Sequence, residues 1–330
     1  MSLFKSRETL LAGAILLLLA LIASRFPGFV APDNLARVFT DTSPLLILAL
    51  GQTVVILSRC IDLSVAANLA LTGMVCAMLN AAMPGLPVVV ILLVAVTLGA
   101  VMGMVNGLLV WKLSIPSIVV TLGTMTIYRG IIFLISDGAW VNAHEMSGAF
   151  TGFPRAQILG LSVLAWFGIL AAVAMIVTIA RTPLGRAFYA VGGNPHAAVY
   201  AGISVGKTQF WAFILSGALA GLCGYLWVAR YAVAYVDIAG GFELEVVAAC
   251  VIGGISIAGG AGTILGTILG ALFLGIVKNA LPVIDVSPFW QMAISGTAII
   301  IAVTLNNRNA KSKGRIILRK AQEQTEGATA

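Results

Sequence analysis

Long apolar stretches separated by short polar connections run through almost the whole chain. Their length approaches the roughly 20 mostly apolar residues that a helix needs to cross a bilayer. The runs are continuous and do not alternate with polar residues, which favours helices over the strands of a β-barrel. We therefore predict an all-α polytopic membrane protein with ten transmembrane spans, at residues 9–26, 43–58, 64–82, 87–111, 116–135, 160–180, 209–229, 243–258, 263–281 and 288–305.

Four of these spans are short, rich in glycine or closely spaced, namely the second, third, eighth and ninth. We expect bends or breaks in them, because membrane proteins tolerate irregular backbone where neighbouring helices satisfy its polar groups. The first span resembles a signal peptide, since Lys5 and Arg7 precede it. No small-x-small cleavage site follows it, so we interpret it as an uncleaved first helix.

A polar island at residues 181–208 interrupts this apolar pattern. A buried loop of this length would leave backbone groups unsatisfied, so we expect the island in water. Asn194 and Pro195 are typical of a helix N-cap and first helical position, and Gly202 is typical of a helix end. The result would be a short helix with a small Ala197–Ala198 face that fits a groove on a partner. An ordinary loop explains the same residues equally well.

The island ends in AGISVGKT, residues 201–208, which nearly matches a phosphate-binding loop. Ala201 stands where the first glycine of that motif belongs. The motif also needs a strand before it and a soluble α/β domain around it, and the sequence predicts neither. We therefore interpret Gly206 and Lys207 as the end of a loop, with Lys207 at the membrane interface.

The composition agrees with a membrane protein, since 60% of the residues are hydrophobic and 9% are charged, against about 25% charged in soluble chains. The net charge is +7, but the basic residues gather at the ends and in a few connections, which argues against nucleic acid as a partner. With the N-terminus inside, thirteen Lys and Arg fall on inner segments and four on outer ones. This bias predicts that both termini and the island are cytoplasmic. The four cysteines have no metal-binding spacing, and we expect them to be reduced packing residues.

The order of the spans is compatible with an inverted repeat, since spans two to five start outside and spans seven to ten start inside. Both groups carry glycine at every fourth position, which lets helix backbones approach closely in lipid. Close packing alone also explains these ladders, which comprise Gly99, Gly103 and Gly107 in the fourth span and Gly262, Gly266 and Gly270 at the ninth. We predict one permease domain at 1–308 and a basic, then polar, tail at 309–330 that is disordered at its end.

Several motifs together resemble the permeases of ABC importers, in the branch that serves ribose, xylose, arabinose, rhamnose and autoinducer-2. The island matches the cytoplasmic coupling segment of that family. The resemblance covers about residues 10–308 and includes IDLSV at 61–65, IPSIVVTLGT at 115–124, YRG at 128–130 and VIGGIS at 251–256. The run from Thr121 to Ile131 looks closest to the rhamnose and autoinducer-2 permeases. The family often has glycine before its Ile-Asp-Leu-Ser, whereas this chain has Arg59-Cys60, which leaves the role of Arg59 open.

The resemblance implies a permease subunit of the bacterial inner membrane that imports rhamnose or a similar sugar, beside a second copy or a paralogue. A periplasmic sugar-binding protein would deliver the sugar. A cytoplasmic ABC ATPase would hold ATP and Mg²⁺ and grip the coupling segment. This chain would then have no catalytic site, metal or cofactor. The residues that the resemblance assigns to ATPase coupling are Arg181, Gly185, Arg186, Gly192, Asn194, Ala197, Ala198 and Gly202.

Polar side chains within the spans are chemically suited to contact a neutral sugar, although hydrogen bonding between helices explains them equally well. These are Gln52, Asn68, Asn106, Thr121, Thr124, Tyr128 and Arg129. We expect Arg59 to pair with Asp62, and Lys278 to extend to the membrane interface. The alternative function is an ion-coupled transporter that acts alone. It would need carboxylates at mid-membrane, and we place Asp62 and Glu245 near the ends of spans.

Overall fold

The structure is a computed structural model that describes residues 7–284, 290, 293 and 296–297. Within them, eight helical segments are long and apolar enough to cross a membrane, which agrees with the predicted all-α polytopic membrane protein. The helices in these segments are α1 (Arg7–Arg25), α2 (Pro32–Leu57), α3 (Val65–Ala82), α4 (Val88–Leu113), α5 (Ser117–Ser136), α7 (Val163–Arg181), α10 (Val205–Tyr231) and α12 (Ile264–Ala280), which continues into η5 (Leu281–Ile284).

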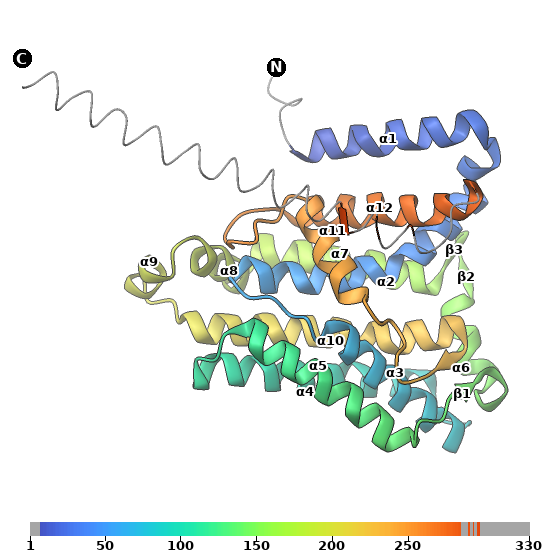
Figure 1. Cartoon of the computed structure of the whole chain (residues 1–330), viewed down its shortest axis with the longest axis horizontal. Coiled ribbons are helices and arrows are strands. Elements are labelled where there is room, and N and C mark those ends of the chain that lie inside the picture. The colour runs from blue at the N-terminus through green and yellow to red at the C-terminus, as the bar shows by residue number, and fades with distance from the viewer. Residues whose placement is uncertain (1–6, 285–289, 291–292, 294–295, 298–330) are drawn as a thin grey trace, which may run out of the picture.

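Shorter elements gather at the two ends of this bundle (Figure 1). At the α9 end, α8 (Pro183–Gly193) and α9 (Pro195–Tyr200) connect α7 to α10. The opposite end, the α6 end, has two antiparallel strand pairs, in which β1 (Val141–Asn142) pairs with β4 (Val233–Ala234) and β2 (Gln157–Ile158) with β3 (Leu161–Ser162). The remaining short elements are η2 (Pro27–Val30), η3 (Ala143–Glu145), α6 (Gly148–Gly152), η4 (Phe153–Arg155) and the half-length helix α11 (Phe242–Ile252).

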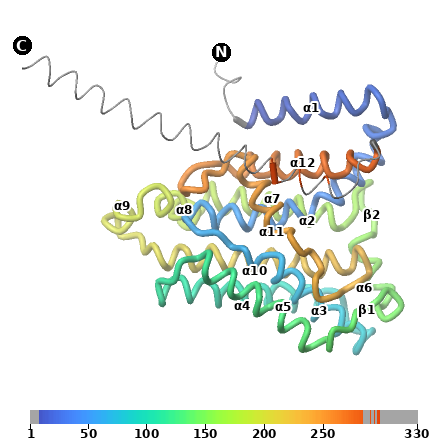
Figure 2. Tube along the Cα trace, viewed as in Figure 1, coloured from blue at the N-terminus to red at the C-terminus, as the bar shows by residue number. Residues whose placement is uncertain are grey.

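The central helices of the bundle are α2 and α10. Figure 2 shows α1 beside α12 at one edge and α4 and α5 toward the other. Helix α10 packs against α2, α3 and α4, and α2 also packs against α7, α11 and α12. The second half of α2 is buried, whereas α1 exposes many apolar side chains, as a helix that faces lipid does.

Helices α4 and α10 pack backbone against backbone at a series of glycines. A Cβ added at Gly99 would collide with the carbonyl oxygen of Gly217 and lie 2.6 Å from the Cα of Gly221. A Cβ added at Gly217 would in turn lie 2.8 Å from the Cα of Gly103. Small residues allow such backbone contact, which maximises dispersion attraction in lipid. The glycine ladder predicted on the fourth span therefore packs helices, with Gly107 against Phe210 at its end.

The second predicted ladder is only partly helical. Gly266 and Gly270 lie on α12 and face the C-terminal end of α11, where a Cβ at Gly270 would lie 2.7 Å from the backbone nitrogen of Gly253. Gly262 precedes α12 and has a φ of 129°, so its assignment to the ladder was wrong. This φ is open to glycine and strained for other residues.

The eighth predicted span, 243–258, is broken, as we expected for it, and is not a single crossing. Helix α11 has 11 residues and is therefore about 16 Å long, roughly half the hydrocarbon thickness of a bilayer. The chain then turns at Gly254, Gly259 and Gly260, which have φ of 89°, 85° and 68°. The tenth span, 288–305, lies outside the described residues apart from isolated positions, so the inverted repeat remains a prediction.

Helix α2 begins eleven residues before the predicted start at 43. Pro32 occupies its first turn, a position that suits a residue without a backbone N–H. The hydroxyl groups of Thr40, Thr42 and Ser43 donate to carbonyls one turn earlier in the same helix. These internal bonds allow polar residues on a membrane helix, so a search for apolar runs underestimates its length.

We predict that Gly103→Leu prevents the α4–α10 contact and destabilises the protein by at least about 2 kcal/mol, because the side chain would overlap the neighbouring backbone. Gly123→Leu is the matched control, since Gly123 lies on α5 with no heavy atom within 4 Å of an added Cβ. Thermal unfolding of both variants in the same detergent measures the difference. Equal unfolding midpoints for the two would contradict the packing role.

Candidate functional site

The polar island folds as two short helices with well-formed N-caps. The Thr182 hydroxyl accepts from Gly185 N at 3.1 Å and starts α8. The Asn194 side chain accepts from Ala197 N at 3.1 Å and starts α9, with Pro195 in its first turn. The predicted helix start at Asn194-Pro195 is confirmed, and Gly202, with φ of 78°, ends that helix as predicted.

Helix α8 was missed, because the island was predicted as a water-exposed loop. Phe188 and Val191 of α8 are fully buried, and α8 packs against α2, α7 and α10. An amphipathic pattern is hard to recognise in 11 residues that include three glycines. Gly185 permits the tight turn from α7, because a Cβ there would lie 2.5 Å from the Cα of Ile179 and collide with its carbonyl.

Helix α9 exposes a different face from the one predicted. Ala198 is 3% exposed and packs inside the chain, so the predicted Ala197–Ala198 face does not exist as a surface. Ala197 is exposed, and Val199 and Tyr200 are 59% and 93% exposed. These last two, together with His196 and Ala197, form a protruding tip at the α9 end, which we call the α9 tip. Arg181 and Arg186 are exposed beside it.

The segment bearing the α9 tip is held to the bundle at a meeting of three chain segments, residues 57–60, 189–193 and 258–262, which we call the loop junction. Arg59 Nε donates to the carbonyl of Gly192 at 2.9 Å and to that of Ala258 at 3.0 Å. Gly260 N donates to Leu57 O at 3.0 Å. The Tyr189 hydroxyl donates to Gly262 O at 2.8 Å, and burial raises the pKa of that hydroxyl and keeps it a donor.

The expected pair between Arg59 and Asp62 is wrong. Arg59 is bonded to the two carbonyls of the loop junction. Asp62 is 2% exposed and accepts from Ser64 N at 2.9 Å, from Ser64 Oγ at 2.6 Å and from Ser216 Oγ at 3.5 Å. Asp62 lies between the end of α2 and the start of α3, as predicted, but its contact with Ser216, near the middle of α10, places the carboxylate deep in the bundle.

At the α6 end, the structure forms a polar pocket of about 480 Å³ that sequence reasoning missed. Its residues come from segments far apart in the chain. These are Asp33, Ala36, Arg37 and Thr40 of α2, Arg155 of η4, Gln157, Gly160 and Ser162 of the β2–β3 hairpin, and Arg230 of α10. We call it the arginine pocket.

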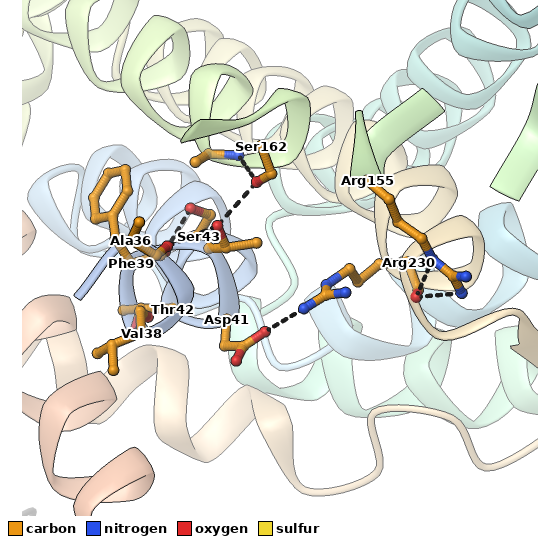
Figure 3. Close-up of polar contacts among 11 residues, drawn as sticks. Ala36, Val38, Phe39, Asp41, Thr42, Ser43, Arg155, Ser162 and Arg230 are labelled. Carbon is orange, nitrogen blue, oxygen red and sulfur yellow. Dashed lines mark hydrogen bonds and ion pairs between the residues drawn. The ribbon is translucent and has the colours of Figure 1, made fainter. Parts of the chain in front are cut away.

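Hydrogen bonds fix the walls of the arginine pocket, as Figure 3 shows in part. Arg155 donates from Nε and Nη2 to the carbonyl of Arg230 at 3.0 and 2.8 Å, and Arg230 Nη2 pairs with Asp41 at 3.1 Å. The hydroxyls of Thr40 and Ser162 are 2.9 Å apart. Three arginines against Asp33 and Asp41 leave the site net positive, and its lining has no aromatic ring. A cationic pocket of this kind favours carboxylates over neutral sugars.

The seven polar residues predicted to line a substrate path mostly join helices. Tyr128 OH donates to Met102 O, and Asn68 Nδ2 donates to Gly99 O. Asn106 Nδ2 donates to Ser64 Oγ. Gln52 bonds the backbone of Asp62, and Thr121 donates to Ile61 O. Thr124 donates to Thr121 O within its own helix. Arg129 donates to Val236 O and Ile238 O.

Lys278 and Glu245 form an ion pair at 2.9 Å that joins α12 to α11. Lys278 was expected to extend to the membrane interface, and its pairing with Glu245 was not predicted. Glu245 lies in the first turn of α11 and Lys278 in the last turn of α12. Pairing lowers the cost of both charges within the membrane, so the ion pair stabilises the half-length helix.

Comparison with known proteins gives one family over most of the chain. Residues 34–303 match the model described as branched-chain amino acid transport system / permease component. The chain is 35% identical over 297 residues to the ribose import permease protein RbsC of Haemophilus influenzae, covering 89% of this chain and 91% of that one. The RbsC of Escherichia coli K12 is 37% identical over 299 residues, covering 89% and 92%. The autoinducer 2 import system permease protein LsrC of Salmonella typhi is 34% identical over 305 residues, covering 92% and 86%. No solved structure matches significantly.

Proposed function

The chain belongs to the family of permease components of branched-chain amino acid transport systems, and we propose that it imports a small sugar as the membrane subunit of an ABC importer. The similarity to ribose and autoinducer 2 import permeases over nine-tenths of the chain supports this solute class. The residues from Thr121 to Ile131 resemble those of the rhamnose and autoinducer-2 permeases, and within that class we propose rhamnose or a similar sugar. The α9 end would then be cytoplasmic, in agreement with the positive-inside bias.

The observation that carries the proposal is the form of the α9 tip. It exposes Val199 and Tyr200 to solvent, while α8 anchors it through a buried apolar face and the loop junction. An exposed aromatic on a short rigid helix is a typical anchor for a protein partner. A cytoplasmic ATPase that grips this tip would supply the free energy of ATP, and the permease would alternate between states that its partners bind unequally.

The arginine pocket supports a protein partner at the opposite end. A periplasmic binding protein that delivers the sugar would dock at the α6 end, and carboxylates on its surface would complement Arg37 and its neighbours. The predicted outer connections also carry acidic side chains, such as Asp137 and Glu145, but these do not line the pocket. A second copy of the chain, or a paralogue, would complete the permease.

The buried carboxylate of Asp62 is a feature that an ion-coupled transporter would also use, so the two functions need a direct test. We expect vesicles containing the permease alone to import no ribose, rhamnose or autoinducer-2 under a proton or sodium gradient. Addition of the ATPase, the binding protein and ATP should start uptake. Uptake driven by an ion gradient without these partners would contradict the importer-subunit proposal.

We predict that Tyr200→Asp reduces co-purification of the ATPase subunit at least about tenfold, because a charge replaces the exposed aromatic anchor. Leu159→Asp is the matched control: Leu159 is 89% exposed at the α6 end, and its φ of 53° suits aspartate. Ala198→Asp is unsuitable, because Ala198 is buried and the charge would destabilise α9 itself. If both variants recover equal amounts of the ATPase subunit, the α9 tip does not contact the ATPase.

We predict that Arg37→Glu weakens binding-protein docking about tenfold or more, since it reverses a charge in the arginine pocket. Arg25→Glu is the control, because Arg25 is exposed at the C-terminal end of α1 and does not line the pocket. The affinity of the binding protein for permease in nanodiscs, measured at low and high salt, tests this. Equal affinities for the two variants would contradict docking at the pocket.

A further inference from the structure

Arg59 occupies a backbone position that suits glycine. Its φ is 64°, in the left-handed region that is strained for a residue with a side chain. The residue directly follows the C-terminal cap of α2, Ser58. A strained conformation persists where surrounding contacts hold it, and here the side chain supplies those contacts.

The Arg59 side chain ties together three chain segments that are also joined by the Gly260–Leu57 and Tyr189–Gly262 hydrogen bonds. A Cβ at Gly192 would collide with Leu57 O and lie 2.8 Å from the Cα of Gly260, and a Cβ at Gly259 would lie 2.5 Å from Arg59 Cγ. The segments therefore approach too closely for other side chains to enter. One donor, Nε, bonds a carbonyl from each of the two segments that face the end of α2.

The charge of Arg59 also suits this place. Helices α2 and α8 both end at the loop junction, and the last carbonyls of a helix carry partial negative charge. A guanidinium that bonds Gly192 O stabilises the C-terminal end of α8. On its other side, Arg59 lines a cavity of about 410 Å³ with Trp111, Ser117 and Gln209, which leaves room for its side chain to move.

We propose that Arg59 is a positioning residue that couples the α9 tip to the membrane helices. It ties the end of α8 to the end of α2 and, through Ala258, to the loop that follows α11. A displacement imposed on the α9 tip then moves both helices. This inference rests on the proposed function for the force that moves the tip, but the tie itself is a property of the chain alone.

Three substitutions at residue 59 distinguish the effect of the arginine side chain from the effect of the strained backbone. Arg59→Gly removes the tie and also relieves the positive φ, so the variant should fold at least as well as the parent. Arg59→Ala removes the tie and keeps the strain. Arg59→Lys keeps a charge, but its compact ammonium on a flexible stem holds two carbonyls less firmly than the planar guanidinium.

The first experiment uses the purified permease without partners. Nitroxide labels on Ala197→Cys and Ala261→Cys report the distance between the α9 tip and the loop after α11, since both positions are exposed. The four native cysteines are buried, and burial raises the pKa of Cys60 to about 12, which keeps this neighbouring thiol unreactive. We expect a narrow distance distribution in the parent, a broad one with Arg59→Gly and an intermediate one with Arg59→Lys. An unchanged distribution with Arg59→Gly would overturn the tie.

The second experiment measures transport in vesicles with the ATPase and the binding protein. We expect Arg59→Gly to retain ATPase association and an ATPase rate within about twofold of the parent, while solute imported per ATP falls roughly tenfold, a coupling loss typical of a displaced two-state element. Arg59→Lys should import more solute per ATP than Arg59→Gly does. A general folding defect would not give this order, because Arg59→Gly relieves the strained φ and should fold at least as well. If Arg59→Gly imports as much solute per ATP as the parent, the coupling role of Arg59 is wrong. Failure of the parent itself to import would count against the proposed function, while the distance measurement still decides the tie.

Discussion

The direct backbone contact between α4 and α10 determines how the other helices can be arranged. Because Gly99 and Gly103 face Gly217 and Gly221 without intervening side chains, the two helices lie as close as their backbones allow. Gly224 of α10 makes a similar contact with α3, where its added Cβ would lie 2.9 Å from Gly73 N. In lipid, where apolar contact with a neighbouring helix replaces equally apolar contact with acyl chains, such packing is a main source of association. Helix α10 is therefore the centre on which α2, α3 and α4 assemble.

Buried polar side chains in the bundle bond backbone groups that lie outside helices. Residues 61–63 connect α2 to α3 outside any helix, so side chains from other helices must satisfy their backbone groups. Gln52 bonds the backbone of Asp62, Thr121 Oγ1 donates to Ile61 O, and Ser117 accepts from Ile61 N. Residues that resemble sugar ligands by composition thus stabilise irregular backbone.

Short sequence patterns predicted some short structural elements, but they did not predict contacts between residues that are far apart in the chain. Asn194-Pro195 predicted the start of α9 because capping depends on neighbours within four residues. The start of α2 was misplaced because hydroxyls that bond their own helix resemble loop residues in composition. Span 243–258 was counted as a crossing because its glycines are apolar by scale, although they adopt turns. The partners of Arg59 lie 133 and 199 residues away, and the arginine pocket joins α2, α10 and a hairpin. Only the folded chain brings these residues together.

The two ends of the protein share one rigid element. Helix α10 has 27 residues and is about 40 Å long. It begins directly after the α9 tip and ends at Arg230 in the arginine pocket, and glycine contacts along its length fix it to α3 and α4. Such a helix can move as a body but is poorly suited to change shape. The half-length α11 packs against α12 and α2 over a shorter length, and it ends in a turn of glycines that Arg59 contacts through Ala258. If binding at one end alters the other, α11 and the end of α2 are the segments best suited to change conformation while α10 keeps the two ends in register.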